Sequence, residues 1–163
     1  MPVTLARIDQ KLIHGQVTVA WVPHLQIDEI IVVDDELRND DFTQVIMCSG
    51  VPARVKKTTF AAAAELQDLL KARQNSPEKL LILFRNVESA VGAIKNHGLK
   101  LESLNLGNQT YMPTTQCQAL SKSFFANSDD LLHLSSLAEG GLRLFLQSIP
   151  AEYPVPFKPP KIT

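Results

Sequence analysis

Hydrophobic residues in this chain form short continuous runs, and the segments between the runs carry hydrophobic and polar positions with helical spacing. Short apolar runs bounded by turn residues are typical of strands buried on both faces of a parallel sheet. Their alternation with helical segments predicts right-handed βαβ units. We therefore expect an α/β fold with an open, mainly parallel central sheet and helices on both faces. The expected strands are Val3–Ala6 with Ile8, Ile27–Val33, Ala53–Lys57, Leu80–Phe84, Leu101–Leu106 and Leu142–Gln147.

Residues with capping chemistry mark the starts of several expected helices. Thr58 or Thr59 and Asn86 are suited to N-cap positions, where a side-chain oxygen accepts a hydrogen bond from the first turn. A shorter apolar segment, Gln16 to Val22, is expected to stop at Pro23, because proline interrupts helical hydrogen bonding. The expected helices are Phe42–Cys48, Ala61–Arg73, Val87–His97 and Asp129–Glu139.

The C-terminal part of the chain departs from the regular alternation. Short antiparallel strands are expected around Gln116–Ala119 and Lys122–Phe125, as a small hairpin or irregular extension. Residues 153–163 contain four prolines, which predicts an extended tail on the surface. The chain has no internal repeat, so residues 1–163 are expected to form a single domain.

The amino-acid composition argues against several classes of binding partner. With 45% hydrophobic residues and a formal net charge of −1, the chain offers no bulk attraction to nucleic acid or anionic lipid. It shows neither a secretory leader pattern nor an apolar window of membrane-spanning length, which predicts an intracellular protein. Cys48 and Cys117 lack metal-spaced partners, so we expect buried free thiols, no metal site and no cofactor.

The clearest candidate for chemistry lies where the first strand gives way to the following apolar segment. His14 stands there beside Gly15 and Gln16, near an expected helix start. Ligands of open α/β sheets collect at the carboxyl ends of the strands, and helix N-termini offer free amides and a positive partial charge to anions. Gly15 lets the backbone approach a ligand closely. The amides of Gly15 and Gln16 are therefore candidate phosphate ligands.

Two cations and a carboxylate accompany this histidine. A neutral imidazole is a competent nucleophile, and Arg7 and Lys11 should disfavour the cationic form of His14. The same two cations can offset the charge of a transferring phosphoryl group, for which catalysis is mostly positioning and electrostatics. Asp9 either orients His14 through a ring N–H or holds Arg7 in place. Trp21 and Val22 either form an apolar rim around the loop or belong to the core.

Weaker candidates for the same site follow later strands. Arg85 follows the strand Leu80–Phe84 and is expected to face the His14 loop across the crevice of the sheet, as a phosphate or partner contact. Gly107 and Asn108 are candidates for shaping the same pocket, although a tight turn is their alternative role.

A different class, a receiver-like or other phosphate-binding regulatory module, would place the phosphate on an aspartate. Its only support is the pair Asp34 and Asp35, for which turn and helix-cap roles are the favoured interpretation. The chain also lacks the glycine-rich motifs of nucleotide-binding proteins.

The amino-acid sequence around His14 also resembles the signature of a known protein family. Residues 7–17 read Arg-Ile-Asp-Gln-Lys-Leu-Ile-His-Gly-Gln-Val, which resembles the signature of the IIB component of sugar phosphotransferase systems, in the mannose/fructose/sorbose branch. The stretches 30–36, with Asn39 and Asp40, then 105–108 and finally 147–152 follow in the order expected of that family. The resemblance thus spans nearly the whole chain.

The resemblance implies a cytoplasmic phosphoryl carrier. The histidine matching His14 would accept a phosphoryl group from a phosphohistidine of a IIA component and donate it to a sugar carried by membrane IIC/IID components. Such an enzyme is a protein-phosphohistidine–sugar phosphotransferase, associated peripherally with the inner membrane face through IIC/IID. Family members are thought to use Nδ1 of this ring, and the resemblance allows a homodimer.

Two positions depart from the family pattern that the segment resembles. Gln10 stands where an acidic or amide residue is frequent, and Lys11 stands where arginine is usual. Lysine supplies a point charge instead of a planar fork, which changes the shape of a phosphate clamp. The stretch 105–108 followed by Tyr111 is similar to the N-acetylgalactosamine/galactosamine branch, although the membrane components would select the sugar.

Overall fold

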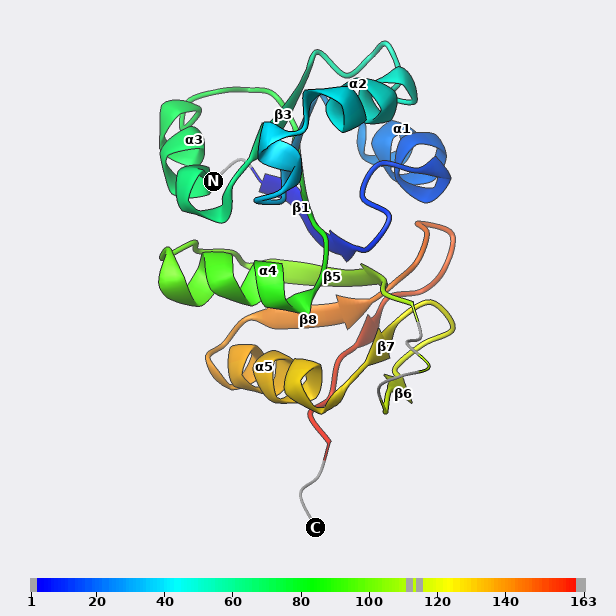
Figure 1. Cartoon of the computed structure of the whole chain (residues 1–163). Helices are drawn as coiled ribbons and strands as arrows, with labels where there is room; N and C mark the ends of the chain where they lie inside the picture. Colours follow the sequence, from blue (N-terminus) through cyan, green and yellow to red (C-terminus); the bar gives the residue numbers. More distant parts are fainter. Residues whose placement is uncertain (1–2, 111–112, 114–115, 161–163) are drawn as a thin grey trace.

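The computed structural model describes residues 3–110, 113 and 116–160. Seven strands form one sheet in the order β3-β2-β4-β1-β5-β8-β9 (Figure 1). The first six run parallel and β9 pairs antiparallel with β8, so the expected open and mainly parallel sheet is confirmed. The strands are β1 (Val3–Asp9), β2 (Glu29–Val33), β3 (Lys57–Ala61), β4 (Leu80–Phe84), β5 (Ser103–Asn108), β8 (Arg143–Leu146) and β9 (Val155–Pro156).

Helices cover both faces of this sheet, as expected. One buried cluster joins one face of the sheet to α3, α4 and α5, and a second joins the other face to η1, α1 and η2. Met47 of α2 packs against the second cluster. The helical elements are η1 (Gln16–Trp21), α1 (Val22–Leu25), η2 (Leu37–Asn39), α2 (Asp41–Ser49), η3 (Ala63–Glu65), α3 (Leu66–Ala72), α4 (Val87–Val91), η4 (Gly92–Asn96) and α5 (Ser128–Glu139).

Strand β1 lies in the middle of the sheet and carries the start of the His14 segment at its carboxyl end. It pairs with β4 on one side and with β5 on the other. In register, Ile8 lies between Phe84 and Leu106, and Asp9 lies opposite Asn108. The loops that follow three neighbouring parallel strands therefore meet at one edge of the sheet, where α/β proteins hold their ligands.

The third strand corrects an expectation. We expected a strand at Ala53–Lys57, whereas β3 is Lys57–Ala61, in register with Glu29–Val33 of β2. Thr58 and Thr59 therefore lie in a strand and do not cap a helix. Because β3 is an edge strand whose residues are mostly half-buried, its polar and β-branched residues obscure the apolar run expected of a buried strand.

Pro23 does not end the first helical segment. The π-helical turn η1 continues directly into α1, and Pro23 is the second residue of α1. The segment ends instead at Gln26, whose φ of 55° is left-handed.

The C-terminal hairpin is confirmed in outline. Strands β6 (Gln118–Ala119) and β7 (Phe125–Ala126) pair antiparallel, with the second strand beginning at the last residue of the expected range. The expected burial of the cysteines is wrong, since Cys48 is exposed and Cys117 is only partly buried. Within the part of the chain that the structure describes, no helix combines the length and apolar character needed to cross a bilayer.

The proline-rich tail is more than a surface extension. Val155 and Pro156 form β9 against β8, and the Phe157 amide donates to the Leu144 carbonyl at 3.0 Å. The Phe157 ring is only 8% exposed and belongs to the core cluster that contains α5. Pro156 is compatible with this pairing because β9 lies at the sheet edge.

Replacing Phe157 with alanine should therefore destabilise the protein. We expect Phe157→Ala to lower the free energy of unfolding by about 3 kcal/mol, as for a buried aromatic ring. Urea unfolding measures this loss. The control Tyr153→Ala removes a ring that is 93% exposed and should change stability by less than about 0.5 kcal/mol. Equal effects of the two changes would show that the tail does not contribute to the core.

Candidate functional site

The loop between β1 and η1 is tightly wound around the end of β1. The Lys11 amide donates to Oδ1 of Asp9 at 3.0 Å, and the Leu12 amide donates to the Asp9 carbonyl at 2.9 Å. Leu12 adopts a left-handed φ of 56° while its side chain is fully buried in the core. A non-glycine residue accepts this conformation only where the surroundings impose it. The loop is therefore anchored on both sides of Lys11.

The Asp9 carboxylate is fully buried and joins the residues of the site. Its Oδ2 atom accepts hydrogen bonds from Nε of Arg7 at 3.0 Å and from Nε2 of His14 at 2.7 Å. The two roles that the sequence left open for Asp9 are thus filled at the same time. One carboxylate both orients the imidazole and holds the guanidinium.

Arg7 is fully buried and its hydrogen bonds point into the protein. Besides Asp9, its guanidinium donates to Oδ1 of Asn105 at 2.7 Å, to the Gln147 carbonyl at 3.0 Å and to Oε1 of Gln16 at 3.0 Å. We expected Arg7 and Gln16 to contact a phosphate. In this conformation the Gln16 side chain covers the guanidinium, so Arg7 faces Asp9 and β5 instead of the surface.

Trp21 lies beside the guanidinium and belongs to the core. The Arg7 Cζ atom lies 5.6 Å from the centre of the Trp21 ring, and the indole N–H donates to the Ser148 carbonyl at 2.9 Å. Trp21 and Val22 are both buried, so neither forms the apolar rim considered above. Burial lowers the pKa of Arg7, while the charge of Asp9 and the hydrogen bond to it oppose that shift. A guanidinium nevertheless keeps its proton in proteins.

The hydrogen bond to Asp9 fixes the tautomer of His14. An ionised carboxylate only accepts hydrogen bonds, so Nε2 of His14 must carry the proton in this contact. The lone pair of a neutral ring then resides on Nδ1. The His14 side chain is 18% exposed, so the ring is partly accessible although one of its nitrogens is held inside.

Lys11 and Gly15 form the exposed part of the loop. Both residues are exposed, and no hydrogen bond or ion pair of the Lys11 ammonium is found within residues 3–110, 113 and 116–160. Gly15 and Gln16 lie at the start of η1, where backbone amides lack helical partners. The free cation beside His14 is therefore Lys11, whereas Arg7 is enclosed.

Gly107 and Asn108 lie in β5 and form no tight turn. Gly107 packs directly against the Arg7 guanidinium. Asn108 is almost fully buried, and its carbonyl accepts a hydrogen bond from the Gln10 amide at 2.8 Å. Both residues thus support the loop from beneath, on the strand next to β1.

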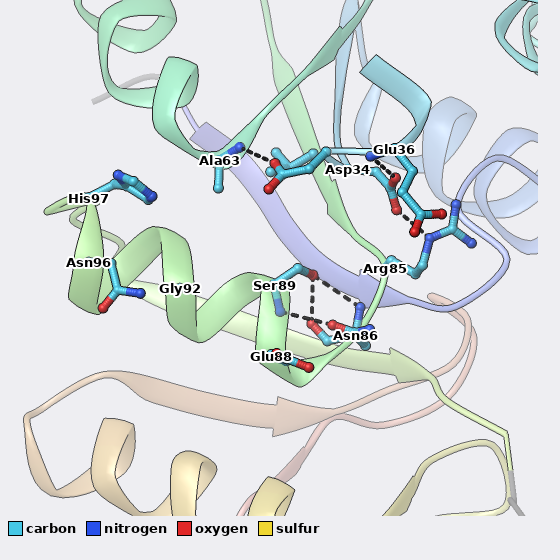
Figure 2. A pocket seen from close by; sticks show the side chains of 12 residues that line it. Asp34, Glu36, Ala63, Arg85, Asn86, Glu88, Ser89, Gly92, Asn96 and His97 are labelled. Carbon is cyan, nitrogen blue, oxygen red and sulfur yellow. Dashed lines mark hydrogen bonds and ion pairs between the residues drawn. The ribbon is translucent and has the colours of Figure 1, made fainter. Parts of the chain in front are cut away.

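Arg85 follows β4, the other neighbour of β1, but its side chain turns toward β2. It forms an ion pair with Asp34, beside Glu36 (Figure 2). These residues line a hollow between the loop after β2 and the start of α4, and His14 is not among the described residues that line it. The expected contact of Arg85 with the His14 site is therefore not seen in this conformation.

Asp34 stabilises the turn that leads into η2, whose N-cap residue is Glu36 and not Asp34. Its Oδ1 atom accepts hydrogen bonds from the amides of Glu36 and Leu37, at 3.0 and 2.9 Å, while Oδ2 faces Arg85. The Asp35 carboxylate accepts a hydrogen bond from the Ala63 amide. Both aspartates therefore accept backbone hydrogen bonds, which agrees with structural roles for the pair.

Reasoning from the sequence missed two partners of Arg7. These are the Asn105 side chain and the Gln147 carbonyl. One signal was present, because Asn105 lies between two leucines in a strand, and a buried amide needs a hydrogen-bonding partner. Nothing in the sequence identifies that partner as Arg7.

Comparison with known proteins assigns this chain to a protein family. The family model "PTS system sorbose subfamily IIB component" matches residues 3–160. A sorbose-specific EIIB component of Lacticaseibacillus casei is 33% identical over 156 residues, covering 91% of this chain and 88% of that protein. The IIB domain of the sorbose permease from Klebsiella pneumoniae has a similar structure, with a TM-score of 0.82 at 26% identity over 95% of this chain and 93% of that one.

The chain belongs to the sorbose subfamily of phosphotransferase-system IIB components. Relatives in this group also include an N-acetylgalactosamine-specific IIB component of Escherichia coli, 25% identical over 92% of each chain. A mannose-specific EIIAB component of the same species is 30% identical over 114 residues, which are 68% of this chain and 34% of that protein. The resemblance noted in the sequence is thereby confirmed.

The buried carboxylate gives a prediction about stability. Asp9→Asn should lower the free energy of unfolding by on the order of 3–5 kcal/mol, because it leaves the buried Arg7 charge without its counter-ion. Thermal or urea unfolding measures the change. The control Asp41→Asn alters an exposed aspartate and should cost less than about 0.5 kcal/mol. Similar losses in the two variants would contradict the enclosed ion pair.

Proposed function

We propose that His14 carries the phosphoryl group of this IIB component, and that Nδ1 is the nitrogen that bears it. The hydrogen bond of Nε2 to Asp9 is the observation that supports this most directly, because it leaves the Nδ1 lone pair free on a partly exposed ring. The donor is the phosphohistidine of a IIA component. The acceptor is a hydroxyl of the sugar carried by IIC/IID components.

The transfer is an in-line displacement. The Nδ1 lone pair of neutral His14 attacks phosphorus, the bond from phosphorus to the donor histidine breaks, and its electron pair returns to the donor ring. Attack from Nδ1 leaves a positive charge on a ring that still carries its Nε2 proton. The Asp9 carboxylate, 2.7 Å from Nε2, stabilises that charge. When the phosphoryl group passes to the sugar oxygen, the bond from phosphorus to Nδ1 breaks, its electron pair returns to the His14 ring, and the sugar hydroxyl releases its proton.

The charge of the phosphoryl oxygens is offset from the exposed side of the loop. Lys11 supplies a free ammonium, and the amides of Gly15 and Gln16 supply donors at the start of η1. Arg7 does not contact the phosphoryl group, because its guanidinium is buried. It acts by holding the Asp9 carboxylate in place. No metal or cofactor is required by this scheme.

The partners follow from the family and from the need to exclude water. A relative whose name joins IIA and IIB in one protein favours a IIA component as the donor. The relatives are named for sorbose, fructose and N-acetylgalactosamine, so their names favour no single sugar. The similarity to the N-acetylgalactosamine/galactosamine branch stays a prediction. Tyr111, which is part of that similarity, lies outside the described residues.

We further propose that the protein works in the cytoplasm, at the inner face of the membrane where IIC/IID components hold the sugar. A carrier of this kind meets two partners in turn through one exposed loop. A homodimer is compatible with this scheme and is not needed for it, since every group assigned above comes from one chain.

Removing the proposed carrier atom gives a direct test. His14→Ala should abolish phosphoryl uptake from a phosphorylated IIA component and leave the far-UV circular dichroism unchanged, because the ring lies at the surface of the loop. The exposed His24 provides the control, and His24→Ala should be phosphorylated at the normal rate. The label should survive alkali and be lost in acid. Uptake by His14→Ala, or an alkali-labile phosphate, would contradict the assignment.

The lysine of the loop should act through its charge. Lys11→Ala should slow phosphoryl uptake by about 10-fold, equivalent to about 1.4 kcal/mol of transition-state stabilisation, because a charge-assisted contact is lost. Lys11→Arg should preserve or improve the rate, since arginine offers two donors to phosphate oxygens. Rapid-quench measurements with phosphorylated IIA give both rates. A large loss in Lys11→Arg would show a role that only lysine fills.

A further inference from the structure

Gly107 lies under the Arg7 guanidinium with no room for a side chain. A Cβ atom built on Gly107 would lie 2.1 Å from Cζ, 2.3 Å from Nη1 and 2.5 Å from Nε of Arg7. Such distances are far below any van der Waals contact, so even alanine must displace the guanidinium or the strand. The flat head of Arg7 rests directly on the backbone of β5.

The other contacts of Arg7 orient it on this surface. Oδ1 of Asn105 accepts from Nη1 of Arg7 at 2.7 Å, and the Gln147 carbonyl accepts from the same nitrogen at 3.0 Å. The Asn105 amide group also donates to the Gln147 carbonyl at 3.0 Å, which fixes its own orientation. Nε of Arg7 is thereby directed at Asp9.

We infer that Gly107 and Asn105 are positioning residues for phosphoryl transfer, acting on His14 through Arg7 and Asp9. The inference rests on the proposed role of His14. Strand β5 sets the plane of the guanidinium, the guanidinium fixes Oδ2 of Asp9, and Oδ2 holds the Nε2 proton of His14. The ring nitrogen that keeps its proton is therefore determined by a strand that contributes no atom to the reaction.

A side chain at position 107 should disturb this chain of contacts without touching the ring. When the guanidinium moves, Oδ2 of Asp9 loses its ion-pair partner while Oδ1 keeps the Lys11 amide, so the carboxylate can turn and the contact to Nε2 weakens. The imidazole then exchanges its tautomers and orientations. A purely structural role of Gly107 in β5 would lower stability and leave the tautomer of the folded protein unchanged.

The experiment compares Gly107→Ala with the unaltered protein by two measurements. ¹⁵N NMR of the His14 ring should show the Nε2–H tautomer in the unaltered protein and a mixture of tautomers in Gly107→Ala. Phosphoryl uptake from phosphorylated IIA should fall by about 100-fold, as for a small misplacement of a reacting group. The fall should lie in the rate constant at saturating IIA, because the docking surface is intact.

Gly92→Ala is the matched control. It makes the same chemical change at a glycine in η4, where the nearest atom to an added Cβ lies 4.0 Å away. Its tautomer and its rate of uptake should equal those of the unaltered protein. A Gly107→Ala variant that behaves like this control would overturn the inference.

A second variant tests the route through Arg7. Lysine at position 7 lacks the planar head that meets Gly107, so Gly107→Ala introduced into Arg7→Lys should change the rate by no more than about 2-fold beyond Arg7→Lys alone. A further 100-fold loss in the double variant would show that Gly107 does not act through Arg7, and would overturn the inference.

The remaining outcomes are also decisive. If Gly107→Ala does not fold, Asn105→Ser replaces it. This change removes the Asn105 acceptor of Nη1 without added bulk and leaves the Gln147 carbonyl in place, so it should mix the His14 tautomers to a smaller extent. An unmixed tautomer there overturns the inference. If the unaltered protein takes up no phosphate on His14, the proposed function fails, whereas the tautomer measurement still decides the role of β5.

Discussion

One buried carboxylate, that of Asp9, holds the candidate site together by serving an enclosed guanidinium and a partly exposed imidazole at the same time. A charge buried as deeply as that of Arg7 is tolerated only where a counter-ion and several hydrogen bonds replace water. The protein meets that requirement with Asp9, Asn105 and the Gln147 carbonyl. These partners come from β1, β5 and the residue after β8, so the site requires these three neighbouring strands to be paired.

The folded structure distinguishes two cations that the sequence alone does not distinguish. Arg7 and Lys11 both stand close to His14 in the chain, and both are cations suited to phosphate. In the folded protein the first is enclosed and orients Asp9, whereas the second is exposed and free. Burial therefore decides their roles: an enclosed charge sets geometry, and an exposed charge can meet an incoming phosphoryl group at little cost in desolvation.

The sequence predicts the parts of this structure that depend on local pattern. The run Leu80–Phe84 coincides with β4 because all five of its residues are buried, whereas β3 was misplaced because an edge strand carries polar residues. The amino-acid sequence around His14 predicted the family, and it indicated His14 as the candidate carrier residue, which stays a prediction. The contacts of Arg7 with β5 could not be predicted. Asn105 lies 98 residues further along the chain and is brought next to Arg7 only by the order of the strands in the sheet.

The left-handed backbone at Leu12 has a consequence for how partners reach the ring. The buried side chain of Leu12 holds this residue in a backbone conformation that is unfavourable in a free loop. The segment is therefore preorganised in the absence of a partner. Under the proposed function, little ordering of the loop remains to oppose the binding of a phosphoryl donor and then of an acceptor. Both would then meet a loop of the same shape.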